Sequence, residues 1–68
     1  METIEHPPYY NKGNIEVIDF ILDKELSFIE GNVVKYICRY KFKGLVDDLR
    51  KAQFYLGLLI KDRESEGI

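Results

Sequence analysis

The sequence contains one cysteine and one histidine among its 68 residues. A single cysteine excludes a disulfide within the chain, and one cysteine with one histidine cannot complete a structural zinc site. A domain of this length buries only about 60% of the surface that its unfolded chain exposes. Small domains without disulfides or metals are commonly stabilised by oligomerisation. We therefore expect a single domain that associates with further copies of itself.

Long apolar runs and an excess of basic residues are also missing. No apolar segment approaches the roughly 20 residues of a transmembrane helix, and the N-terminus lacks the basic and then apolar order of a signal peptide. The net charge of -2 and a pI of about 5.3 argue against general nucleic-acid binding. These features predict a cytoplasmic protein. We interpret Cys38 as a packed core thiol in a reducing compartment.

The residues that are present predict an all-α fold in one domain. It is divided into an N-terminal extended arm, a helical core and a short tail, at residues 1–14, 15–63 and 64–68. Both prolines lie in the arm, close to His6 and Tyr10, and they stiffen it. The arm either packs over the core or forms one side of a binding site.

The middle helix has the clearest sequence signals. Ser27 followed by Glu30 is a capping box, which predicts the start of this helix. Gly44 is interpreted as the glycine that ends it. Gly31 lies in its first turns, where glycine costs about 1 kcal/mol relative to alanine. We therefore expect a neighbouring backbone or a ligand to approach Gly31 closely.

Two further helices are predicted on either side of the middle one. The first runs from Ile15 to Lys24 with Asn14 as its N-cap, and the third runs from Leu45 to Arg63. The inward stripe of the third helix consists of Leu45, Leu49, Ala52, Leu56, Leu59 and Ile60. Phe54 and Leu58 lie on its opposite side, one turn apart, and predict a subunit interface.

A stripe of polar residues follows one side of the middle helix, at about 100° per residue. It consists of Asn32, Lys35, Arg39 and Lys43. Two interpretations remain open. The cations pair with carboxylates of the same chain, for which Glu16, Asp47 and Asp48 are the candidates. Alternatively, Arg39 binds a phosphate through two parallel hydrogen bonds while the two lysines add charge, and a tyrosine such as Tyr36 stacks on a base.

Known catalytic motifs are absent from the sequence. It contains no phosphate-binding loop and no dinucleotide-binding fingerprint, and no serine or cysteine triad or set of metal ligands is recognisable. The residues therefore favour a binding protein over an enzyme, with no catalytic residue, no metal site and no cofactor assigned.

The order of residues resembles a known family. The residues that carry the resemblance are His6, Tyr10, the run from Gly13 to Ile21, Gly31-Asn32, Lys35-Tyr36, Arg39-Tyr40, Lys43-Gly44, Asp48-Leu49, Lys51-Ala52 and Tyr55-Leu56. This pattern is similar to the small phage-encoded "nucleotide kinase-like" domain, a family formerly of unknown function, and it covers about residues 6 to 60. A larger member of that family is a kinase of nucleoside monophosphates.

The resemblance implies a nucleotide-binding role in the cytoplasm of an infected bacterial host. The resemblance assigns nucleotide binding to the following residues: Asn32, Lys35, Tyr36, Arg39, Lys43, Asp48 and Lys51, with His6 and Tyr10 from the arm. We expect a protein that binds or sequesters a nucleotide, linear or cyclic, in a pocket between subunits of a homo-oligomer, as phage sponges for immune signalling nucleotides do. The alternatives are a nucleoside monophosphate kinase, in which Asp47 or Asp48 holds Mg²⁺, and an inhibitor that binds a host enzyme through Phe54 and Leu58.

Overall fold

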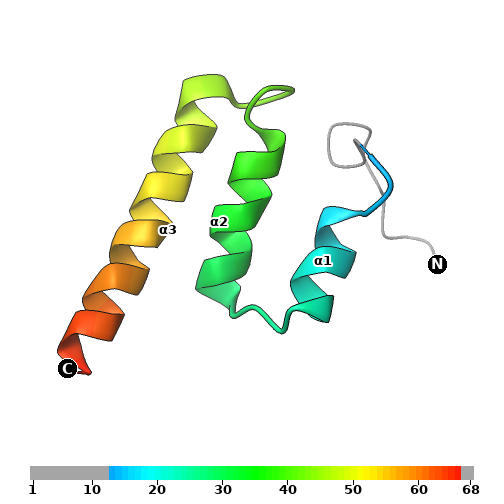
Figure 1. Ribbon diagram of the computed structural model, residues 1–68. Coiled ribbons are helices and arrows are strands. Elements are labelled where there is room, and N and C mark those ends of the chain that lie inside the picture. Colours follow the sequence, from blue (N-terminus) through cyan, green and yellow to red (C-terminus); the bar gives the residue numbers. More distant parts are fainter. Residues whose placement is uncertain (1–12, 67–68) are drawn as a thin grey trace.

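The computed structural model describes residues 13–66, which form three α-helices joined by short turns (Figure 1). Helix α1 spans Val17–Asp23, α2 spans Phe28–Arg39 and α3 spans Leu45–Ser65. The described residues contain no strand, so the predicted all-α class is confirmed. The arm, with His6 and Tyr10, lies almost entirely outside the described residues. None of the helices in 13–66 is long and apolar enough to cross a membrane.

The three helices lie side by side in a single layer, and each runs in the opposite direction to the one before it (Figure 1). Helix α2 occupies the middle and contacts both others, whereas α1 and α3, which are described along their whole lengths, do not contact each other. A layer of this kind leaves both broad sides of the α2–α3 pair uncovered by α1.

The predicted capping box sets the start of α2. The backbone N–H of Glu30 donates to Ser27 Oγ at 3.1 Å, and the backbone N–H of Ser27 donates to Glu30 Oε1 at 2.8 Å. Gly31, one residue later, is buried. A Cβ atom at Gly31 would lie 3.3 Å from Cγ2 of Ile21. A side chain of α1, rather than the backbone or ligand that we expected, therefore makes the close approach at this glycine, and it brings α1 onto α2.

The end of α2 differs from the prediction. The helix ends at Arg39, and Gly44 is the N-cap of α3 with φ -94°, so the assignment of Gly44 as the glycine that ends α2 is wrong. The left-handed conformation in this turn belongs to Leu45, with φ 50°, whose N–H donates to the carbonyl of Tyr40 at 2.8 Å. Glycine is required at position 44 because the carboxylate of Asp48 occupies the place of a Cβ atom.

The outer two helices also differ in length from the prediction. Helix α1 begins two residues later than expected and ends one residue earlier, and its N-cap is Glu16, in extended conformation, rather than Asn14. Helix α3 begins at Leu45 as predicted but continues to Ser65, two residues beyond the predicted end.

Little apolar surface is buried in the described part of the chain. Ala52 is its one buried hydrophobic residue, and Leu59 is half-buried. The predicted inward stripe of α3 is therefore only partly inward, since four of its members are exposed: Leu45, Leu49, Leu56 and Ile60. Cys38 is exposed as well, so its interpretation as a packed core thiol is wrong. Partial burial nevertheless raises the pKa of the Cys38 thiol. A single layer of helices covers each helix on two sides at most, which explains both corrections.

Candidate functional site

Three cations from two helices surround one aromatic ring. The Lys35 Nζ atom lies 4.5 Å from the centre of the Tyr36 ring, the Arg39 Cζ atom 5.0 Å and the Lys51 Nζ atom 5.5 Å. Cations within about 6 Å of a ring centre are attracted to its π face. We call these four residues the cationic cluster. It joins one side of α2 to one side of α3.

An ion pair with two hydrogen bonds joins Arg39 of the cationic cluster to Asp48. Arg39 Nε donates to Asp48 Oδ2 at 2.8 Å, and Arg39 Nη2 donates to Asp48 Oδ1 at 2.9 Å. The two side chains are 14% and 1% exposed, so this carboxylate is buried against the guanidinium. The hydrogen bond from Arg39 lowers the pKa of Asp48 from its ordinary value of 3.8, against the opposing effect of desolvation.

The aromatic part of the site extends from Tyr36 along α3. Tyr36 and Tyr55 stack with their ring centres 6.1 Å apart and 15° between the planes. Phe28 and Phe54 meet Tyr55 edge to face, at 6.3 Å and 5.3 Å. Offset and edge-to-face pairs of this kind are the preferred aromatic geometries. The cations therefore lie beside a continuous aromatic surface that spans both helices.

A small cavity of about 220 Å³ adjoins the cationic cluster where α1 meets α2. It is lined by Ile21, Leu26, Ser27, Phe28, Gly31, Asn32 and Lys35. Asn32 is 8% exposed, and its side-chain amide donates to the carbonyl of Phe28 at 2.9 Å. Lys35 belongs to both the cavity and the cluster, so an anion held by the cluster would lie next to this partly apolar cavity.

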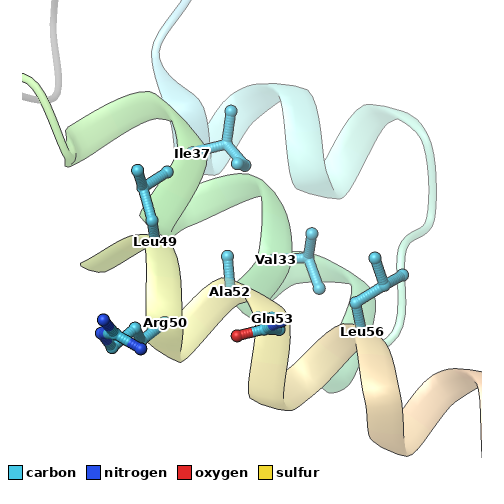
Figure 2. A pocket seen from close by; sticks show the side chains of 7 residues that line it. All are labelled: Val33, Ile37, Leu49, Arg50, Ala52, Gln53 and Leu56. Carbon is cyan, nitrogen blue, oxygen red and sulfur yellow. The ribbon is translucent and has the colours of Figure 1, made fainter. Parts of the chain in front are cut away.

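The opposite side of the α2–α3 pair has a different character. An open groove of about 410 Å³ runs between the two helices, and Figure 2 shows its lining: Val33, Ile37, Leu49, Arg50, Ala52, Gln53 and Leu56. Lys35 and Ile37 differ by two residues, which is about 200° around a helix. The cluster and this groove therefore face opposite ways.

The chain matches one described protein family. A family described as a protein of unknown function, DUF3310, matches residues 4–57. The chain belongs to the DUF3310 family. No curated protein and no solved structure matches the chain. The DUF3310 match includes all four residues of the cationic cluster and Asp48, and it stops before the last two turns of α3.

The structure of this DUF3310 protein brings together most of the site residues expected from the sequence. Five of them contact one another or line the adjoining cavity on one side of the layer, together with Asp48: Asn32, Lys35, Tyr36, Arg39 and Lys51. Lys43 lies in the turn beyond the end of α2, where its backbone N–H donates to the carbonyl of Arg39 at 3.1 Å. His6 and Tyr10 lie outside the described residues.

Sequence reasoning did not assign Tyr55 and Phe28 to the site. Tyr55 follows Lys51 by four residues on α3, and side chains at this spacing lie on the same face of a helix. That spacing was the available signal for Tyr55. Phe28 is the first residue of α2, and its ring reaches Tyr55 across the layer, a contact for which periodicity within one helix offers no indication.

Proposed function

We propose that this DUF3310 protein binds a nucleotide, or another phosphorylated small molecule with an aromatic base, at the cationic cluster. The observation that supports the proposal is the convergence of Lys35, Arg39 and Lys51 on the Tyr36 ring from two helices. The net charge of the protein is -2, so three cations beside one buried carboxylate form a local positive region on an acidic molecule. A bound anion would be attracted to this region.

Lys35 and Lys51 are the residues that we assign to the phosphate. The edge of Arg39 that carries Nε and Nη2 binds Asp48, so this edge is not presented to a ligand. Lys51 is 53% exposed in its side chain, and Lys35 is half-buried and lines the 220 Å³ cavity. We therefore assign Arg39 to holding the cluster together and the two lysines to charge-assisted contacts with the ligand.

The ring system offers a place for the base. Tyr36, Tyr55 and Phe28 form the aromatic surface beside the lysines, and stacking on aromatic side chains accepts any nucleobase. Resemblance to the phage nucleotide kinase-like domain supports the same ligand class. In our proposal the nucleotide is sequestered without reaction, in a homo-oligomer and within an infected bacterial host.

Phosphoryl transfer is the alternative, and one contact makes it the weaker one. A kinase needs carboxylates that hold the Mg²⁺ bridging the phosphates. Asp48 instead accepts two hydrogen bonds from Arg39 at 2.8 Å and 2.9 Å. Within residues 13–66 no three His, Cys, Asp or Glu side chains are grouped so that they could hold a metal ion. Binding without conversion therefore fits the described part of the site better.

The test is to incubate the purified protein with a panel of nucleotides, release any bound ligand by heat and identify it by chromatography. We expect intact nucleotide to be retained. Lys35→Ala and Lys51→Ala should each weaken the affinity at least about tenfold in calorimetric titration, because a hydrogen bond to a charged group contributes about 1.5–3 kcal/mol.

Lys24→Ala, on an exposed lysine that is not part of the cluster, is the matched control and should bind like the wild type. Retention of no member of the panel would refute the proposal, as would equal affinities for the two cluster variants and the control. Conversion of a monophosphate in the presence of Mg²⁺-ATP would establish the kinase alternative instead.

A further inference from the structure

The side of α3 that faces away from α2 carries an exposed apolar patch. Phe54 is 61% exposed and Leu58 is 38% exposed. Asp47 and Lys61 lie on the same face as Phe54, because residues seven apart on an α-helix differ in direction by only about 20°. The face therefore has an acid near one end, an aromatic residue at its centre and a base near the other end. We call it the outer face of α3.

Gly57 adds a second observation on the outer face. Within residues 13–66, a Cβ atom at Gly57 would meet no other atom within 4 Å. Gly31 and Gly44 differ in this respect, since neighbours within the chain occupy the space beside them. The contacts among the described residues therefore give no reason for a glycine in the middle of α3, where it weakens the helix. A bare backbone next to an exposed ring is a surface onto which another ring can pack.

The charges on the outer face are complementary to a copy of the same face. Asp47 precedes Phe54 by seven residues and Lys61 follows it by seven, so the two charges lie about 10 Å on either side of the ring along the helix axis. Neither side chain forms an ion pair within residues 13–66. Placing a second α3 antiparallel, with the two-fold axis at Phe54, brings each Asp47 opposite the Lys61 of the other copy.

We propose that the occupant of the outer face is a second copy of this chain, bound through an antiparallel α3–α3 contact about a two-fold axis at Phe54. In this dimer Phe54 packs beside Gly57 of the partner subunit, and Leu58 lies at the edge of the contact. Two symmetry-related ion pairs between Asp47 and Lys61 fix the register. A two-fold contact of one face with itself is the commonest arrangement in homo-oligomers.

The experiment is a charge exchange followed by sedimentation over a range of protein concentrations at low salt. Asp47→Lys and Lys61→Asp alone should each weaken dimerisation at least about tenfold, because each change places two pairs of like charges in the contact. The double variant Asp47→Lys with Lys61→Asp should recover the wild-type dissociation constant to within about threefold, since the coupled pair is restored with its signs reversed. Recovery in the double variant shows that the single changes act through the contact and not through the stability of α3.

The matched control is Asp23→Lys, which makes the same change from a negative to a positive charge at an exposed residue of α1. This control should leave dimerisation unchanged. Phe54→Glu combined with Leu58→Glu should give a folded monomer by circular dichroism and sedimentation. A wild-type chain that stays monomeric at all concentrations would overturn the proposal. So would single variants that dimerise normally, or a double variant that does not recover. None of these outcomes is read from nucleotide binding, so a failure of this proposal is distinguishable from a failure of nucleotide binding at the cationic cluster.

Discussion

The two sides of the α2–α3 pair are formed by the same two helices but are held together in different ways. On the cationic side the helices are joined by directional contacts, namely the Arg39–Asp48 pair and the stacked rings of Tyr36 and Tyr55. On the other side, the groove between the helices is lined by apolar side chains that remain partly exposed to solvent. Examples are Ile37 and Leu56, which are 48% and 45% exposed.

This difference indicates where the α2–α3 contact gets its stability. A hydrophobic contact stabilises the folded state in proportion to the apolar area that it removes from water. The side chains of the groove bury little apolar area. A buried pair of opposite charges stabilises weakly by itself, but it becomes costly when one partner is removed. The cationic side should therefore be the sensitive side of the molecule and the groove side the tolerant one. Three measurements test this difference between the two sides.

The largest effect is expected from Arg39→Ala. The change leaves the carboxylate of Asp48, which is 1% exposed, without its main partner, and the melting temperature should fall by more than about 10 °C. Arg63→Ala is the matched control, because Arg63 forms an exposed ion pair with Glu66 at 3.0 Å. Exposed pairs contribute little, so the control should melt close to the wild type. Similar melting temperatures for the two variants would show that the cationic side is not the sensitive one.

An intermediate effect is expected from acid. The pKa of Asp48 is lowered from its ordinary value of 3.8, chiefly by the hydrogen bond from Arg39. A lowered carboxyl pKa contributes stability that is fully present above the unfolded-state pKa and is lost as the pH falls through the folded-state pKa. The difference in melting temperature between the wild type and Arg39→Ala should therefore narrow as the pH falls below about pH 4, because the wild type loses this contribution there. A difference that stays constant down to about pH 2 would contradict the assignment of this pair.

The smallest effect is expected from Leu56→Ala in the groove. Leu56 is 45% exposed, so removing its side chain should lower the free energy of unfolding by about 1 kcal/mol, as measured by urea denaturation. A loss above about 3 kcal/mol is typical of a fully buried leucine. Such a loss would show that something covers the groove in solution, and the contrast between the two sides would then be false.

The sequence predicted those features that depend on neighbours along the chain. The capping box at Ser27 and Glu30 is local, and it marked the start of α2 correctly. The alternative in which Arg39 pairs with a carboxylate of helix three also agrees with the structure, because Asp48 lies in the first turn of α3. The choice between Asp47 and Asp48 required the relative rotation of two helices, which periodicity within each helix does not specify.

Features that depend on how the helices are arranged were not predictable in the same way. Periodicity shows which residues share a face, but it does not show whether another element covers that face. Leu49 and Leu56 have the spacing of core residues and are nevertheless exposed, because the helices form one layer rather than a closed bundle. Gly44 was misassigned for a related reason. Its role depends on the side chain of Asp48, four residues later, and not on a left-handed backbone.

Because α1 lies at the end of the layer, we expect it to be less stable against local unfolding than the α2–α3 pair. Helix α1 has seven residues, none of them buried, and it meets α2 where Ile21 packs against Gly31. Helices shorter than about 12–15 residues are marginal in water without tertiary support. Loss of that one contact region would release α1 while leaving the Arg39–Asp48 pair and the tyrosine stack in place. We therefore expect local opening within residues 13–66 to be hierarchical, with α1 detaching at a lower free energy than is needed to open the α2–α3 hairpin.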